Sequence, residues 1–224
     1  MRNIVLTIGG SVILSKELES SYFKKLASLL KKISEQNKLF LVVGGGNVAR
    51  KYIKLGRELG FNEKILDLIG IDITRINAKF LSNILADYNN NIPHTIDEAT
   101  KIDKSIVIMG GTTPGHSTDM VGAGIAEKTY AELFVIATNV DGIYDKDPNR
   151  YTDAKQFKEI EIDQLIKSFG TKWVKAGKHM VIDGPALEII KKAKLNTYVL
   201  NGKRLNQLEK ALNFQPFDGT KIIV

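Results

Sequence analysis

The stretch Gly110-Gly111-Thr112-Thr113-Pro114-Gly115-His116-Ser117-Thr118-Asp119 decides the fold of this chain. An apolar run at residues 106–109 precedes it, and a segment rich in small residues, 120–126, follows it. This order predicts a buried strand, a glycine-rich loop and a closely packed helix. Such a loop exposes backbone N–H groups beside the positive end of a helix, so it is typical of an anion-binding site in an α/β protein.

Asp119, at the end of this loop, has two interpretations. Aspartate is a good helix N-cap, so Asp119 can begin the helix that follows. A carboxylate is an odd choice for a loop that only binds anions, so Asp119 can instead be a catalytic group. The loop alone favours neither interpretation.

The pattern of strand, glycines and helix occurs twice more, nearer the N-terminus. Residues 4–8 lead into Gly9-Gly10-Ser11, and residues 39–43 lead into Gly44-Gly45-Gly46-Asn47 and a helix predicted over 48–59. Neither loop has the spacing of a Walker A loop or of a dinucleotide-binding fingerprint. Helical patterns also cover residues 20–35, 62–88, 163–168, 185–192 and 205–212, and strand patterns cover 133–138, 197–200 and, at the sheet edge, 219–224.

This alternation of strands and helices predicts an α/β fold, a three-layer α/β/α sandwich with a mostly parallel central sheet. The 224 residues are enough for a single domain that buries its core without disulfides. The glycine loops then lie together at the carboxyl ends of the strands. We therefore expect ligands to bind along one edge of the sheet.

Composition excludes several classes of function. The chain has no cysteine and three histidines, which excludes thiolate catalysis, cysteine-ligated zinc and iron–sulfur clusters and argues against a histidine-rich metal site. The net charge is +7 and the pI about 9.3, but the lysines are interspersed with acids, so we expect a solvated surface and no nucleic-acid binding. No signal peptide and no apolar run of the ~20 residues that span a bilayer is found, which predicts a cytoplasmic protein without membrane contact.

Polar residues also cluster on one face of the helix predicted over 62–88. Asp67, Gly70, Thr74 and Asn77 follow one another at helical spacing. Either a ligand or a tightly packed neighbouring helix would satisfy them, and the residues by themselves favour the packed helix.

Five segments taken together resemble the amino acid kinase superfamily and, within it, the archaeal uridylate kinases. The segments are Gly9-Gly10-Ser11, residues 42–50, the helix with Asp67-x-x-Gly70 and Thr74-x-x-Asn77-Ala78, the loop 110–119, and residues 137–144. The resemblance covers essentially the whole chain, including Val181-Ile182-Asp183 and the closing Gly219-Thr220-Lys221-Ile222.

This resemblance implies an enzyme that transfers the γ-phosphoryl group of ATP to UMP, with Mg²⁺ present. It implies one amino acid kinase domain over 1–224, with an acceptor-binding lobe at about 1–125 and an ATP-binding lobe at about 126–224, and assembly as a homohexamer. Because the phosphate of UMP is already a competent nucleophile, no general base is required.

The resemblance also implies the site residues. Those that match UMP positions are Gly45, Asp67, Thr113, Pro114, Gly115, His116, Ser117, Thr118 and Asp119. Those that match ATP positions are Gly9, Gly10, Ser11, Gly46, Arg50, Thr138, Asn139, Tyr144 and Asp147, with Tyr144 placed to pack on a base. The catalytic candidates are Gly10, Arg50, Asp119 and Lys178. Asp119 would organise cationic groups or metal around the γ-phosphate, and no dedicated metal-binding residue is expected.

The chain departs from the superfamily pattern in three places. Many members carry lysines where this chain has Thr7 and, approximately, Met180, so Lys175, Lys178 and Arg50 are the nearest replacements. The third departure is an extra glycine in Asp183-Gly184-Pro185.

Two alternatives to a UMP kinase stay open. One is a nucleotide-binding sensor or storage subunit without catalysis, which the absent lysines suggest. The other is a superfamily enzyme acting on a carboxylate, a carbamate or isopentenyl phosphate. The isopentenyl type is expected to carry a histidine beside the second glycine loop, where this chain has Asn47-Val48-Ala49.

Overall fold

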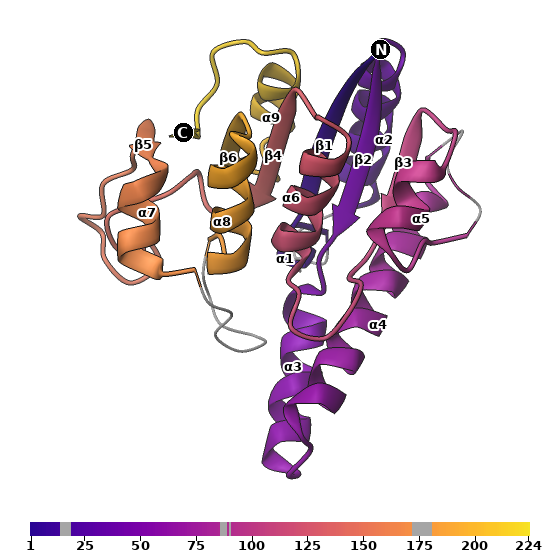
Figure 1. The fold of residues 1–224 in the computed structure, drawn as a ribbon, viewed down its shortest axis with the longest axis vertical. Helices are drawn as coiled ribbons and strands as arrows, with labels where there is room; N and C mark the ends of the chain where they lie inside the picture. The colour runs from indigo at the N-terminus through magenta and orange to yellow at the C-terminus, as the bar shows by residue number, and fades with distance from the viewer. Residues whose placement is uncertain (14–18, 86–88, 90, 172–180) are drawn as a thin grey trace.

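The computed structural model describes residues 1–13, 19–85, 89, 91–171 and 181–224, and within them the chain forms one sheet flanked by helices (Figure 1). The strands are β1 Arg2–Ile8, β2 Asn37–Val43, β3 Ile106–Met109, β4 Leu133–Thr138, β5 Glu159–Glu161, β6 Thr197–Asn201 and β7 Thr220–Ile223. The helices are α1 Gly10–Ile13, α2 Ser20–Ser34, α3 Gly46–Glu58, α4 Glu63–Ser82, α5 Ile96–Lys101, α6 Thr118–Lys128, α7 Ile162–Phe169, α8 Gly184–Ala193 and α9 Leu205–Leu212.

The strand order in the sheet is β3-β2-β1-β4-β6-β7-β5. The strands from β3 to β6 in this order pair in parallel, while β7 pairs antiparallel with β6 and parallel with β5. The prediction of a mostly parallel sheet is therefore confirmed. As a result, β1 to β4 all end at the same edge of the sheet, with the chain termini toward the other edge (Figure 1).

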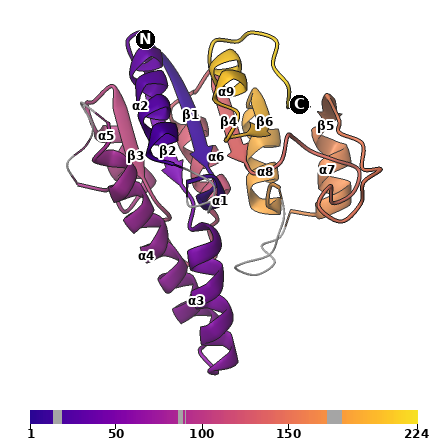
Figure 2. The same ribbon diagram turned by 180° about the vertical axis from the view of Figure 1, so that it is seen from behind.

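Helices cover both faces of the sheet, as a three-layer sandwich requires. Helices α2 and α9 lie on one face and α5, α6 and α8 on the other, as Figures 1 and 2 show from opposite sides. Along β1, Ile4 and Leu6 point into the first layer and Val5 points into the second. Strands that are buried on both faces read as continuous apolar runs, which is why the sequence pattern identified them.

Three predicted elements differ from the structure. The strand β7 is not at the sheet edge, because β5 pairs outside it, and the three residues of β5 are too few to leave a clear pattern. Residues 10–13 form the short helix α1 instead of a loop, with the Val12 N–H donating to the Gly9 carbonyl at 2.8 Å. Helix α4 ends at Ser82, earlier than the predicted residue 88.

Helices α3 and α4 form a hairpin that projects beyond the carboxyl edge of the sheet (Figure 1). Ala49, Ile53 and Leu66 pack between the two helices. A second set of large apolar side chains on the hairpin is exposed, and we call it the α3–α4 apolar face: Tyr52, Leu55, Leu59, Ile65, Leu68 and Ile76. The 3.6-residue period places these side chains on one side of the hairpin. No helix among the described residues is both long and apolar enough to cross a membrane.

Candidate functional site

The first two glycine loops touch each other at the carboxyl edge of the sheet. The Gly9 N–H donates to the Ala137 carbonyl at 2.9 Å, and the Gly44 N–H donates to the Ile8 carbonyl at 2.9 Å, so each loop is fixed to the neighbouring strand. A Cβ on Gly10 would lie 2.5 Å from the Gly45 carbonyl carbon. Only a residue without a side chain allows the two backbones to approach this closely.

The second glycine loop opens directly into helix α3. The N-cap of α3 is Gly45, which has no side chain to cap the helix, and Gly46 takes a φ of +64°, which favours glycine. The first-turn N–H groups therefore remain available to an anion. Arg50, one turn into the helix, donates to Asn47 Oδ1 at 2.5 Å, and burial lowers the pKa of its guanidinium. The arrangement can bind a phosphate group.

Thr74 and Asn77 on the polar face of α4 contact loops, whereas Gly70 on the same face packs against Ile53 of α3. Asn77 Nδ2 donates to the Gly44 carbonyl at 2.8 Å, so it fixes the second glycine loop. Thr74 Oγ1 accepts from the Gly111 N–H at 2.6 Å and donates to the Ile71 carbonyl at 2.6 Å. The packed-helix interpretation that the residues favoured is therefore wrong for these two side chains, which join the loops after β2 and β3.

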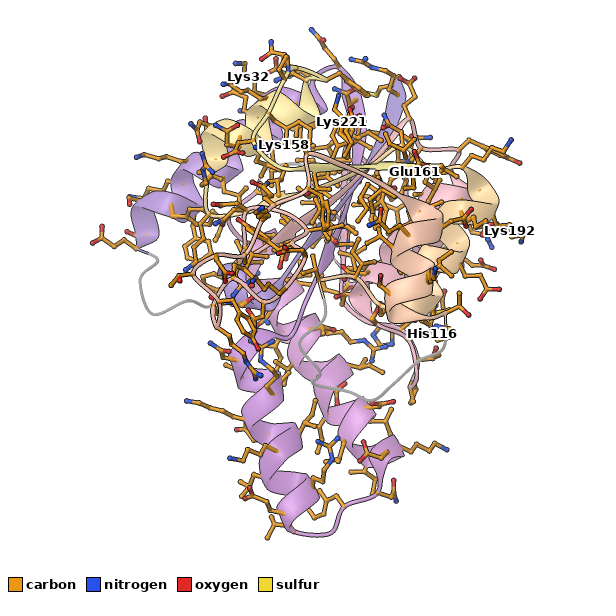
Figure 3. All side chains as sticks on the ribbon, turned by 90° about the vertical axis from the view of Figure 1, so that its left-hand side faces the viewer. Lys32, His116, Lys158, Glu161, Lys192 and Lys221 are labelled. Atoms are coloured by element: carbon orange, nitrogen blue, oxygen red, sulfur yellow. The ribbon has the colours of Figure 1, made fainter. Side chains whose placement is uncertain are left out.

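The loop of residues 110–119, hereafter the central loop, is held from both ends. Asp67 on α4 accepts from the Gly115 N–H at 2.8 Å, and Gly115 has a φ of +83° that favours glycine. Within the loop, Thr113 Oγ1 lies 3.1 Å from His116 Nδ1. Figure 3 shows His116 at the end of the sheet from which the helical hairpin projects.

Helix α6 is capped by Ser117, so the suggestion that Asp119 caps it is wrong. The Met120 N–H donates to Ser117 Oγ at 2.9 Å, and Asp119 lies inside the first turn. Its Oδ1 accepts a hydrogen bond of 3.0 Å from Thr7 Oγ1 on β1. Thr7 thus occupies the place where a lysine was expected and contacts Asp119 with a hydroxyl. In the described part of the chain, no hydrogen bond reaches the other oxygen, Asp119 Oδ2.

Asp119 is held in an environment that disfavours its charge. Burial raises its pKa, the negative charge of Asp183 adds to this effect and the Thr7 hydrogen bond opposes both, which together give a pKa of about 7. Asp183 is the N-cap of α8, accepts from the Ala186 N–H at 3.0 Å, and also accepts from the Ser117 hydroxyl. Burial raises the pKa of Asp183 as well. Two carboxyl groups with perturbed pKa values at one edge are typical of a functional site.

The extra glycine beside Asp183 has a steric reason. A Cβ on Gly184 would lie 2.6 Å from the Thr171 carbonyl carbon and 2.7 Å from the Gly170 oxygen. The backbone that follows α7 crosses the start of α8 at this point. Glycine is therefore required for helix α8 to begin against that backbone.

The residues that were matched to ATP positions divide into two groups. Thr138 ends β4 beside Gly9. Its backbone carbonyl accepts from the Gly202 N–H at 2.8 Å, and its hydroxyl oxygen Oγ1 lies 3.4 Å from Asn139 Oδ1. Tyr144 and Asp147 lie in the segment that follows Asn139. The backbone of Tyr144 forms an isolated antiparallel β-bridge with Gln156, and Asp147 Oδ1 accepts from the Asn149 N–H at 2.9 Å. Among the described residues, no hydrogen bond or ion pair joins this second group to the glycine loops.

Two features of the site were missed from the sequence. One is a charged cluster in which Asp141 accepts from Asn201 Nδ2 at 2.9 Å and Arg204 donates to Asp218 at 2.6 Å. Burial together with Asp141 raises the pKa of Tyr144. The other is Arg75 on α4, whose guanidinium donates to the Thr112 carbonyl in the central loop at 3.2 Å. No local motif marks either feature, because their partners lie 14 to 60 residues away.

The catalytic candidate Lys178 lies outside the described residues, as do Lys175 and Met180. Of the other cations, several at the surface pair with acids, such as Lys32 with Glu209 at 2.9 Å and Lys158 with Asp218 at 2.6 Å. Figure 3 shows Lys32, Lys158 and Lys192 far from His116. Among the described residues, no group of three His, Asp or Glu side chains could hold a metal ion.

Comparison with known proteins agrees with this geometry. The model of the Amino acid kinase family matches residues 2–201. The chain belongs to the amino acid kinase family. This amino acid kinase is 44% identical over 223 residues to a uridylate kinase from Methanobrevibacter smithii, with 98% of each chain covered.

Solved structures show the same fold as this amino acid kinase. The crystal structure of uridylate kinase from Archaeoglobus fulgidus has a TM-score of 0.84 and 39% sequence identity, covering 99% of this chain and 100% of that one. An isopentenyl phosphate kinase has a TM-score of 0.71 at 16% identity, covering 98% of this chain and 100% of that one. The second likeness concerns the fold alone.

Proposed function

We propose that this amino acid kinase is a UMP kinase, which transfers the γ-phosphoryl group of ATP to UMP and yields UDP and ADP. Uridylate kinases with about 40% identity over nearly the full chain support this assignment. The observation that carries it is the contact between Gly10 and the second glycine loop. This contact brings two phosphate-binding loops together beside the central loop.

The acceptor nucleotide is bound by the central loop and its neighbours. In this proposal Gly45 and the first turn of α3 hold the phosphate of UMP through backbone N–H groups. Asp67 uses Oδ2 for the Gly115 N–H and can offer Oδ1 to a hydroxyl of the sugar. Residues 113–118 enclose the rest of the nucleotide.

The ATP phosphates lie against the first glycine loop, on the other side of the Gly10 contact. Gly9, Gly10, Ser11 and Gly46 provide amides, and Arg50 provides a positive charge. Thr138, Asn139, Tyr144 and Asp147 form the pocket for the nucleoside, with Tyr144 beside the base. Mg²⁺ enters as part of the MgATP substrate, because its preferred sites combine nucleotide phosphates with few protein ligands.

Catalysis by these residues rests on alignment and charge. Phosphoryl transfer requires an in-line arrangement of the acceptor oxygen and the γ-phosphorus, with stabilisation of charge on the transferred oxygens. Asp119, at the junction of the two substrates, orients the cationic groups there. Lys178 and Arg50 are the proposed cations. Because Thr7 stands in the place of a lysine, these two residues must neutralise more of the negative charge on the phosphate oxygens.

The test of this function is a coupled assay of ADP release with UMP, CMP and AMP as acceptors. We expect the highest kcat/KM with UMP, and a clear preference for CMP or AMP would contradict the assignment. Asp119→Asn distinguishes an enzyme from a binding subunit. The variant should lose most of its turnover and still bind UMP in a calorimetric titration, whereas a binding subunit has no wild-type turnover.

A homohexameric, cytoplasmic assembly is the accompanying proposal. The α3–α4 apolar face supports self-association, since Tyr52 is 55% exposed, Leu68 is 45% exposed and Ile76 is 61% exposed. Contiguous apolar surface of this kind marks a protein contact. The proposed UMP residues all lie within an acceptor-binding lobe at about 1–125. The proposed pocket for the ATP nucleoside lies within an ATP-binding lobe at about 126–224, and the ATP phosphates reach the glycine loops of the first lobe.

A further inference from the structure

Arg75 lies on α4 and faces the central loop. One guanidinium nitrogen donates to the Thr112 carbonyl at 3.2 Å, another lies 3.7 Å from Asp72, and the side chain is 23% exposed. The adjacent residue Thr74 accepts from the Gly111 N–H. Helix α4 therefore holds two consecutive residues at the beginning of the central loop.

The contact with Arg75 sets the direction of the next backbone N–H. A trans peptide group is planar, so its carbonyl and its N–H point in opposite directions, and the described residues contain no cis peptide. Because the Thr112 carbonyl points to Arg75, the N–H of Thr113 points away from α4. Among the described residues, no acceptor contacts that N–H.

Stability alone does not account for this contact. Arg75 Nε and Thr112 Oγ1 are both buried and have no hydrogen-bond partner among the described residues. Unpaired buried polar atoms destabilise a fold, and the atoms that remain unpaired in native proteins call for an explanation. Two apolar side chains in place of Arg75 and Thr112 would hold the loop without the free-energy cost of unpaired buried polar atoms. A requirement for a particular direction of the peptide explains the arginine.

We propose that Arg75 is a positioning residue for the acceptor: its guanidinium fixes the Thr112–Thr113 peptide so that the Thr113 N–H faces an oxygen of the bound nucleoside monophosphate. This inference deepens the proposed UMP kinase function and rests on it.

Arg75→Met tests the inference, because methionine keeps the length of the stem and removes the donors. We expect KM for UMP to rise at least about tenfold, the size of one hydrogen bond from a charged donor. KM for ATP and kcat should stay within about twofold of the wild type because, within the described part of the chain, Arg75 pairs with Thr112 and Asp72 and with none of the residues proposed to bind ATP. Arg75→Lys should restore part of the loss, because lysine retains the charge without the planar fork.

Arg2→Met is the matched control. Arg2 begins β1 at the edge of the sheet opposite to the glycine loops, where it donates to Asn37 Oδ1 at 3.2 Å, so its loss should leave KM for UMP unchanged. A KM for UMP in Arg75→Met within about twofold of the wild type would overturn the inference.

Hydrogen exchange separates a failure of this inference from a failure of the proposed function. In the free protein, amides in residues 110–117 should exchange faster in Arg75→Met than in the wild type or in Arg2→Met. Unchanged exchange overturns the role of Arg75, whichever substrate the enzyme uses. A wild-type protein that does not phosphorylate UMP contradicts the function, and the exchange result still decides the role of Arg75. If Arg75→Met does not fold, the Arg75→Lys comparison decides by the same two measurements.

Discussion

The hydroxyl of Ser117 donates a hydrogen bond to the carboxylate of Asp183, and each of these residues is the N-cap of a different helix. The bond fixes the start of α6 to the start of α8. Because α6 follows the central loop and α8 belongs to the C-terminal part of the chain, one side-chain contact sets the distance between the two halves of the site. Asp119, two residues after Ser117, takes its position from this contact.

Removal of the Ser117 hydroxyl should destabilise the protein more than removal of an ordinary cap. Ser117→Ala loses the cap of α6, which costs about 1 kcal/mol, and leaves one oxygen of Asp183 unpaired, which adds about 1–2 kcal/mol. Thr95→Ala is the control, since Thr95 caps α5 by accepting from the Glu98 N–H and has no second role in the site. Urea unfolding measures both variants, and equal losses would show that the Asp183 contact contributes nothing.

The stability of the wild type should fall as the pH rises from about 4 to about 7. The pKa of Asp119 is raised from 3.8 to about 7 in the folded protein, so in this range the unfolded chain has released a proton that the folded chain still holds. Well above pH 7, where Asp119 is ionised in both states, its contribution to the free energy of unfolding no longer changes with pH. Asp119→Asn removes it, so the variant should become more stable relative to the wild type across this range. A difference in unfolding free energy that does not change with pH would contradict the raised pKa.

The pH dependence of turnover should respond to Asp183. If the ionised form of Asp119 is required, kcat/KM rises with pH around a midpoint near 7, because kcat/KM reports the pKa values of the free enzyme. Asp183→Asn keeps an oxygen that caps α8, replaces the oxygen that accepts from Ser117 by an amide N–H group that can donate to Ser117 Oγ, and removes the negative charge that raises the pKa of Asp119. The midpoint should therefore move to lower pH. His116 also interacts electrostatically with Asp183, so the effect of Asp183→Asn is measured a second time in the His116→Gln background. The midpoint should move to lower pH there as well.

Alanine substitutions should distinguish the two adjacent glycines of the first loop. A Cβ on Gly10 would lie 2.5 Å from the Gly45 carbonyl carbon, so Gly10→Ala forces the two loops apart and should cost several kcal/mol, roughly 3 or more. A Cβ on Gly9 meets the Ala137 oxygen at 3.4 Å, an ordinary contact. Gly9→Ala should keep nearly the wild-type melting temperature and raise KM for ATP. Similar melting temperatures for the two variants would refute the close contact.

A charge on the α3–α4 apolar face should reduce the size of the assembly. Leu68→Glu places a carboxylate where a second chain is proposed to bind, and burying an unpaired charge is strongly unfavourable. Lys64→Glu, at an exposed position of the same helix, is the control. Light scattering after size exclusion measures the mass. If both variants keep the mass of the wild type, this face is not the contact.

The order of the motifs already places much of this site. Buried strands that each end in glycines and are followed by helices must form parallel units with one handedness, so the three glycine loops had to meet at one edge. The reasons for glycine at positions 10 and 115 came from the structure, because a Cβ on Gly10 would meet the second glycine loop and Gly115 takes a φ of +83°. The reversed strand β7 and its neighbour β5 were not placed correctly, because three residues leave no periodic signal.

The sequence by itself thus determined the parallel sheet, the glycine loops and the family, because these depend on local periodicity and on the order of segments. Only the tertiary structure decided which of Ser117, Thr118 and Asp119 caps α6, since the choice depends on Asp183, 66 residues from Ser117 along the chain. It also decided that Thr7 partners Asp119 across 112 residues and that Gly184 is needed against residues 170–171. Hydrogen bonds and steric contacts between distant segments have no local pattern, because the fold alone brings their atoms together.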